Sequence, residues 1–191
     1  MRKTLAVFLC LAFAVPQTFA FMLIPKAGVD ISGTINYEKD PDRETKRGFF
    51  IGAETRGQIS GYFSCGAGFE YLLPRGFAGF PEDDDFSFLP VYFSVLFYPL
   101  GAWDKARPYV KAGAGYSVLA MTNADADMSG GVYWTAGIGA EYKNFVGEVM
   151  ASNYGAEYDG QKFSYRKIGL SLGYKFDINL FEFKEEEGED F

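Results

Sequence analysis

Bulky apolar residues alternate with small or polar residues, with a period of two, in segment after segment of this chain. In residues 168–176 one face carries Ile, Leu, Leu, Tyr and Phe, and the other carries glycine, serine and lysine. In residues 26–37 the apolar face comprises Ala27, Val29, Ile31, Gly33, Ile35 and Tyr37. Such alternation indicates β-strands, because successive side chains of a strand point to opposite faces. The sequence therefore predicts an all-β protein whose strands have one bulky and one small face.

Six further segments alternate in the same way, at residues 49–56, 62–72, 87–98, 109–120, 132–142 and 145–154. The resulting eight strands are each about as long as the roughly 9 to 11 residues with which a tilted strand crosses a bilayer. Longer connections at 38–48, 73–85, 121–131 and 155–163 alternate with shorter ones at 57–61, 99–108 and 143–144. Long loops at one end and short turns at the other are typical of outer-membrane barrels. We predict an eight-stranded antiparallel up-and-down transmembrane β-barrel over residues 21–178.

The composition of the two faces distinguishes a membrane barrel from a soluble one, which would have an apolar interior. Small residues dominate one face: Gly52, Ser64, Gly66, Gly68, Ser94, Gly113, Gly115, Gly137, Gly139, Gly169, Ser171 and Gly173. Bulky residues dominate the other: Phe63, Phe69, Val91, Phe93, Val95, Phe97, Val110, Trp134, Ile138, Val149, Leu170 and Leu172. A glycine-lined face suits a narrow lumen, and an aromatic and aliphatic face suits lipid. Four residues depart from this pattern, since Tyr92, Leu96, Val146 and Met150 fall on the lumen face.

Charged residues of the strands share the small-residue face, as expected if a charge on the lipid face costs free energy. The predicted lumen charge network comprises Asp30, Glu54, Arg56, Glu70, Lys111, Glu141, Glu148 and Lys175, with Lys26 as a further partner. Buried charges need partners, because an unpaired one costs several kcal/mol. The network fits either a salt-bridged plug or a narrow or gated ion path. We favour the plug, since side chains can fill a lumen of eight strands.

Tyrosines near the strand ends are candidates for the aromatic girdles that membrane barrels carry at both interfaces. These residues are Tyr37, Tyr71, Tyr109, Tyr133, Tyr142 and Tyr174. The alternative is that they are simply good strand formers.

Residues 1–20 have the three parts of a secretory signal peptide. Arg2 and Lys3 precede an apolar run that ends at Pro16, and Ala20 offers a small residue at the cleavage site. At about twelve residues the run is too short for a membrane-spanning helix, which needs roughly 20. Removal of the signal would take Cys10 with it, so Cys65 would remain without a partner for an intrachain disulfide.

The last predicted strand, Ile168-Gly-Leu-Ser-Leu-Gly-Tyr-Lys-Phe176, resembles the terminal assembly signal of the small outer-membrane β-barrel family of the OmpA and OmpX type. The resemblance covers roughly residues 22–178. It implies that the barrel assembly machinery recognises Tyr174 and Phe176 as the assembly signal, and it implies contact with outer-membrane lipid and lipopolysaccharide. The chain departs from the family because Asp177 to Phe191 follow the signal, and residues 179–191 of this stretch are rich in acidic residues. We expect this acidic segment to form a disordered periplasmic tail.

The composition argues against several function classes. A net charge of -7 would repel nucleic-acid phosphates, and the absence of histidine removes the commonest general base and metal ligand. Glu82-Asp83-Asp84-Asp85 matches no EF-hand spacing, so a calcium site there is a minor alternative. No cofactor or metal is expected. Lipid-modifying barrel enzymes generally use histidine, although a Ser-Lys or Ser-acid pair near Ser152 or Ser171 stays open.

We therefore expect a monomeric, non-enzymatic barrel of the bacterial outer membrane with a structural or surface-interaction role in envelope integrity or adhesion. A small or gated pore for ions or small solutes is the first alternative, and a lipid-modifying enzyme is the second. The role follows from a resemblance in fold, which constrains function only loosely.

Overall fold

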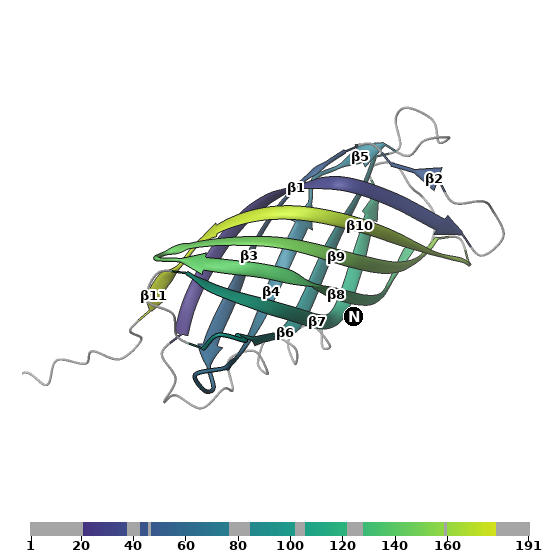
Figure 1. Ribbon diagram of the computed structural model, residues 1–191. Coiled ribbons are helices and arrows are strands. Elements are labelled where there is room, and N and C mark those ends of the chain that lie inside the picture. The colour runs from purple at the N-terminus through teal and green to yellow at the C-terminus, as the bar shows by residue number, and fades with distance from the viewer. Residues whose placement is uncertain are drawn as a thin grey trace, which may run out of the picture.

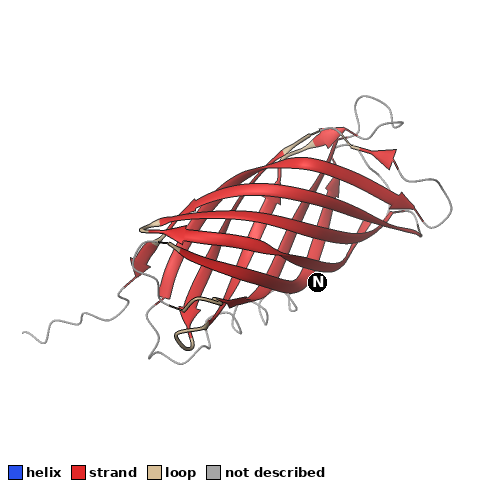
Figure 2. Cartoon of the chain, viewed as in Figure 1, coloured by secondary structure: helices blue, strands red, loops and turns tan. Residues whose placement is uncertain are grey.

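The computed structural model describes residues 21–37, 43–45, 47–76, 85–101, 106–121, 128–158 and 160–178. Strands make up almost all of this part (Figure 2). No helix in it is long and apolar enough to cross a membrane. The predicted signal peptide, the acidic tail and residues 82–84 of the acidic loop lie outside the described residues.

Eight long strands of the described chain form one closed antiparallel barrel, as predicted (Figure 1). They are β1 (Phe21–Tyr37), β3 (Phe49–Gln58), β4 (Phe63–Leu72), β6 (Asp85–Phe97), β7 (Arg107–Met121), β8 (Met128–Tyr142), β9 (Phe145–Tyr158) and β10 (Gln161–Tyr174). Each long strand pairs with the next one along the chain, and β10 pairs with β1. Closure leaves no unpaired edge strand, which a bilayer would not tolerate.

Three short strands extend the barrel at its two ends. β2 (Arg43–Glu44) pairs with β1, β5 (Arg75–Gly76) pairs with β6, and β11 (Phe176–Ile178) pairs with the start of β1. Figure 1 places β2 and β5 at one end of the barrel, and the start of β1 with β11 at the other. We call these the loop end and the terminal end.

The strands are staggered around the barrel. Pairing that starts at Leu23 and passes through every strand returns to β1 at Thr34, eleven positions further along. One of these positions is Ile31, which a bulge leaves unpaired between Asp30 and Ser32. A stagger of this kind tilts the strands, so that inward side chains of neighbouring strands lie at different heights.

Two predicted loops are shorter in the structure. β9 and β10 continue through residues 155–163 and are joined at 159–160, where Gly160 has a φ of 73°. β8 begins at Met128, inside the predicted loop 121–131. The sequence interpretation ended these strands too early because their outward residues become polar at the loop end, while backbone pairing continues. The predicted two-residue turn at 143–144 is present, with Lys143 at a φ of 54°.

The outer face agrees with the prediction. All twelve bulky residues assigned to it are exposed on the barrel wall. All twelve small residues assigned to the other face are buried or half-buried. The bulge at Ile31 produces one exception, since it turns Gly33 and Ile35 into the lumen instead of outward. Ile35 is only 1% exposed, so its predicted place on the outer face was wrong.

Two of the tyrosines predicted for the girdles lie elsewhere. Tyr109 and Tyr133 are 2% and 0% exposed and fill the lumen. Both share the inward face with charged or small residues of their strands, and a bulky residue on that face is not lipid-facing. Tyr142 and Tyr174 are exposed at the terminal end, as a girdle requires, and Tyr71 is half-buried. The side chain of Tyr37 lies outside the described residues.

Candidate functional site

The predicted lumen charges lie inside the barrel. Seven of them are buried: Asp30, Glu54, Arg56, Glu70, Lys111, Glu141 and Glu148. The side chain of Lys175 is 16% exposed. Strand alternation and barrel closure bring these residues together from β1, β3, β4, β7, β8 and β9.

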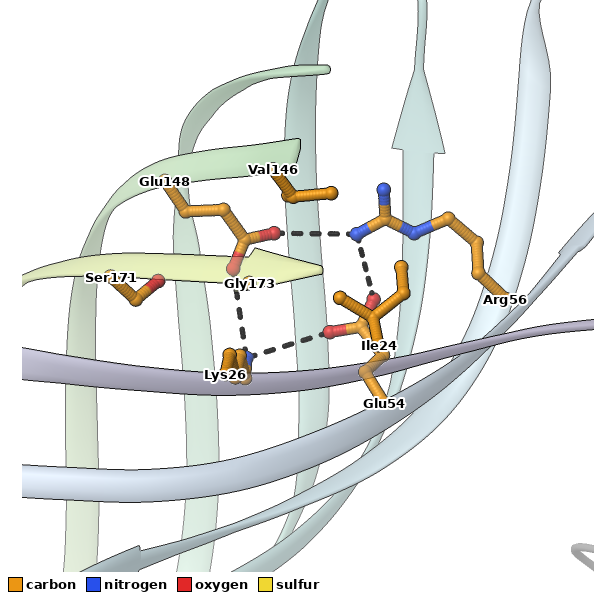
Figure 3. A pocket seen from close by; sticks show the side chains of 8 residues that line it. All are labelled: Ile24, Lys26, Glu54, Arg56, Val146, Glu148, Ser171 and Gly173. Carbon is orange, nitrogen blue, oxygen red and sulfur yellow. Dashed lines mark hydrogen bonds and ion pairs between the residues drawn. The ribbon is translucent and has the colours of Figure 1, made fainter. Parts of the chain in front are cut away.

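Four charged residues form a ring inside the lumen (Figure 3). Arg56 Nη2 lies 3.1 Å from Glu54 Oε1 and 3.4 Å from Glu148 Oε1. Lys26 Nζ lies 3.5 Å from Glu54 Oε2 and 3.6 Å from Glu148 Oε2, which completes the ring. Lys111 also pairs with both carboxylates, at 2.9 Å from Glu148 Oε1 and at short range from Glu54. Glu54 and Glu148 are therefore each shared by three cations.

Tyrosine hydroxyls also donate hydrogen bonds to the carboxylates of this network. Tyr109 donates to Glu148 Oε1 at 2.8 Å, and Tyr92 donates to Glu54 Oε2 at 3.2 Å. Tyr98 donates to Glu141 Oε1 at 2.8 Å. Hydrogen bonds to ionised acceptors are stronger than neutral ones, so these contacts offset part of the cost of burying charge.

Glu141 closes the network at the terminal end. It accepts from Arg56 Nη1 at 2.7 Å and from Lys175 Nζ at 2.8 Å. Lys175 follows β10 directly, between the exposed Tyr174 and Phe176. Its inward side chain therefore ties the end of the predicted assembly signal to the wall at β8.

A second cluster surrounds Asp30 toward the loop end. Arg75 Nη1 and Lys167 Nζ both pair with this carboxylate, the lysine at 3.0 Å. Arg75 also donates to the Tyr165 hydroxyl at 3.0 Å and to the Phe49 carbonyl at 3.1 Å. Lys26 and Lys167 lie 3.0 Å and 3.9 Å from Glu70, so Glu70 links the two clusters.

The predicted network did not include Arg75 or Lys167. Arg75 falls in a predicted loop, and no periodicity of the sequence points a loop side chain into a barrel. Lys167 immediately precedes the predicted last strand, which began at Ile168. Extending the alternation by one residue would have placed Lys167 on the inward face, because it shares parity with Gly169 and Ser171.

Glycines of the wall make room for the inward tyrosines. A Cβ at Gly139 would overlap the ring of Tyr109, and one at Gly68 would lie 2.9 Å from the hydroxyl oxygen of Tyr92. The small residues therefore compensate for large side chains on neighbouring strands. The lumen is narrow, as predicted, but tyrosines fill much of it. The sequence interpretation had assigned Tyr109 and Tyr133 to the interface and had treated Tyr92 as an exception.

The interior is tightly packed beside the charged ring. The pocket between Lys26, Glu54, Arg56 and Glu148 has no room for a water molecule. Nearer the loop end, an aromatic layer comprises Phe86, Phe88, Tyr154, Phe163 and Tyr165, all of them buried. Phe88 lies at its centre, with ring centroids 5.3 Å from Tyr154 and 6.1 Å from Tyr165.

The serines considered for catalysis belong to this packing. Ser152 shares a 2.9 Å hydrogen bond with Thr135. Ser171 is buried and lines the pocket beside Lys26. These surroundings favour a structural role for both hydroxyls.

No family model and no curated protein matches the chain. Among solved structures, the chain is similar to Neisserial surface protein A, with a TM-score of 0.55, 13% identity, and coverage of 82% of this chain and 97% of that one. It is also similar to the outer membrane protein OprG from Pseudomonas aeruginosa, with a TM-score of 0.52, 15% identity, and coverage of 83% and 97%. Ail, the attachment invasion locus protein of Yersinia pestis, has a TM-score of 0.48, 20% identity, and coverage of 82% and 99%.

These similarities concern the fold. The chain has the fold of the small eight-stranded transmembrane barrels, with a wall that is apolar outside and charged inside. They do not single out the OmpA and OmpX type within that group.

Proposed function

We propose that the chain is an integral, non-conducting barrel of the outer membrane, with a structural or surface-interaction role carried by its loop end. The apolar outer face and the exposed residues Tyr142, Phe145 and Tyr174 at the terminal end support insertion in a bilayer. In this orientation the terminal end faces the periplasm and the loop end faces the outside of the cell.

The observation that carries the proposal is the packing of the lumen at two different heights. The charged ring and the aromatic layer are both made of buried side chains. Since every ring carboxylate faces several cations, displacing one cation leaves the others in place. The barrel therefore supports a rigid anchor better than a channel.

Planar bilayer conductance tests this proposal. We expect no steady openings from the purified full chain, and none from Lys111→Met, because Lys26 and Arg56 still pair with both ring carboxylates. Heat-modifiable migration on gels would verify that each variant is folded. Steady ion-selective openings of the unaltered protein would overturn the plug and favour the pore.

A further inference from the structure

Arg107 is a cation without a carboxylate partner at the inner rim of the terminal end. It begins β7, and it shares the inward face of that strand with the buried Tyr109 and Lys111. Its guanidinium carbon lies 4.3 Å from the centroid of the Tyr98 ring. The residue is half-buried, and its Nε and Nη2 atoms are buried without a hydrogen-bond partner. Buried donors that lack an acceptor cost free energy, so this rim favours an anionic ligand.

Glu141, the residue opposite Arg107 in the register, is already used by other donors. Its Oε1 accepts from Arg56 and from Tyr98, and its Oε2 accepts from Lys175. Among the described residues, Arg107 forms no ion pair with Glu141 or with another carboxylate. We call these five residues the terminal mouth. In the described part of the chain, three cations of the terminal mouth surround one carboxylate.

A strongly acidic segment follows the barrel at this same end. Residues 179–191 contain six carboxylate side chains, at positions 182, 185, 186, 187, 189 and 190, and one lysine. They follow β11, which pairs with the start of β1 at the terminal end (Figure 1). The charge of the segment is therefore complementary to that of the terminal mouth, and the segment begins beside it.

The segment is long enough to reach Arg107. β1 and β7 lie on opposite sides of the barrel, since three long strands separate them in either direction. With tilted strands spaced about 4.8 Å apart, an eight-stranded barrel is about 16 Å across between backbones. The seven residues from Ile178 to Glu185 span up to about 24 Å when extended. Glu185 and the carboxylates after it can therefore reach the terminal mouth.

We propose that the acidic segment 179–191 of this chain docks into the terminal mouth, where one of its carboxylates pairs with Arg107. The planar guanidinium offers donors in a fork that matches a carboxylate. A short flexible tether keeps the acidic side chains at an effective concentration on the order of mM, which offsets the entropy lost when a disordered segment binds. The contact is intramolecular, so it goes beyond the proposed function and does not depend on it.

The distance between two spin labels on the purified full chain, measured by double electron–electron resonance, tests this. The labels are attached at Gly61→Cys and Gly188→Cys, after Cys10→Ser and Cys65→Ser remove the native thiols. Gly61 lies in the turn between β3 and β4, where an added Cβ meets nothing within 4 Å. Neither label replaces a charged residue, so the charges of the segment and of the terminal mouth are kept.

A neutral-tail variant provides the reference, because it leaves every barrel residue in place. It combines Glu185→Gln, Glu186→Gln, Glu187→Gln, Glu189→Gln and Asp190→Asn. We expect the distance distribution of the labelled protein to be at least twofold narrower than that of the neutral-tail variant. It should broaden at about 1 M salt, where screening weakens the ion pair.

Arg107→Gln should broaden the distribution to the width of the neutral-tail variant. The matched control is Lys143→Gln, which removes an exposed lysine at the same end and should change nothing. Heat-modifiable migration of every variant shows that the barrel is folded.

The proposal is overturned if the labelled protein is as broad as the neutral-tail variant, if Arg107→Gln stays narrow, or if Lys143→Gln broadens the distribution as much. A free acidic peptide that binds the terminal mouth while the chain's own segment stays broad would assign the mouth to a separate partner, and would also overturn it. Channel openings of the unaltered protein would contradict the proposed function without changing these distances, so the two failures are distinguishable.

Discussion

Ile31 and Ile35 lie on opposite faces of β1, although they are four positions apart and a regular strand would place them on the same face. Ile31 is 52% exposed on the outer wall and Ile35 is 1% exposed in the lumen. The bulge between Asp30 and Ser32 shifts the strand by one position. It occurs at the level where the outward residues of the neighbouring strand β10 change from the apolar Ile168 to Arg166, both of them exposed. Ile31 therefore meets lipid and Ile35 joins the interior around the aromatic layer.

This difference predicts unequal effects of two identical substitutions. Ile35→Ala leaves a cavity in a packed interior and should lower the free energy of unfolding by about 2–5 kcal/mol. Ile31→Ala only trims a lipid-facing side chain, so its effect should be much smaller. Urea unfolding in lipid vesicles, followed by tryptophan fluorescence, measures both. Equal losses would contradict the inward placement of Ile35.

Arg56 pairs with three carboxylates of the lumen, those of Glu54, Glu141 and Glu148. Arg56→Met should lower the free energy of unfolding by about 3–5 kcal/mol, because it leaves buried carboxylates undercompensated. Adding Glu141→Gln should restore part of the loss, since it removes one of those charges. The same urea titration measures these variants. Arg166→Met, at an exposed site, is the control, with an expected change within about 0.5 kcal/mol. An Arg56→Met protein as stable as the unaltered one would contradict a stabilising network.

The sequence determines most of this fold through one physical constraint. Lipid penalises charge, so Glu54, Lys111 and Glu148 had to share a face, and alternation alone identified that face. The constraint ends where the barrel leaves the hydrocarbon. Beyond that level Tyr165 is buried inside and Arg166 faces outward, which is the pattern of a soluble barrel. Neither simple alternation nor a single polarity rule could therefore assign the residues at the loop end.

Ile35 shows why the change of the outer face from apolar to polar could not be recognised in the sequence of β1. The change of polarity and the one-residue bulge coincide, so the sequence keeps its alternation through both. Arg75 was missed for another reason. It reaches Asp30 from outside the long strands, and its position depends on the closed barrel rather than on local pattern.

Alanine substitutions at Gly139 and Gly147, two glycines of the same sheet, should affect stability differently. A Cβ at Gly139 would overlap the Tyr109 ring, whereas one at Gly147 would lie 3.8 Å from Leu172 Cδ2, an ordinary contact. Gly139→Ala should therefore destabilise the barrel by about 1–3 kcal/mol, as overpacking does. Gly147→Ala should be neutral or slightly stabilising. Refolding yield and urea unfolding measure both.

Tyr109→Leu combined with Gly139→Ala provides the control. A smaller inward side chain should recover part of the stability that Gly139→Ala loses, beyond the cost of Tyr109→Leu alone. Additive losses in the double variant would show that the two positions do not compete for the same space.

At the end of β10, we expect a double variant whose barrel assembles poorly in the cell but refolds normally in vitro. Tyr174 and Phe176 are 37% and 51% exposed, with ring centroids 4.8 Å apart, and neither fills the lumen. Lys175 between them points inward to Glu141. If the two aromatic residues are read by the barrel assembly machinery, Tyr174→Ala combined with Phe176→Ala should reduce the folded barrel in outer-membrane fractions several-fold. Unaided refolding into vesicles should change little, because both side chains face lipid.

The matched control is Leu172→Ala, which removes a 69% exposed side chain from the same face of β10, two residues before the pair. It should leave assembly in the cell close to normal. Heat-modifiable migration measures the folded fraction in both settings. Equal assembly of the double variant and the control would show that the pair carries no signal. A matching loss in unaided refolding would show instead that the pair stabilises the closure of β10 on β1, since that loss would not require any assembly machinery.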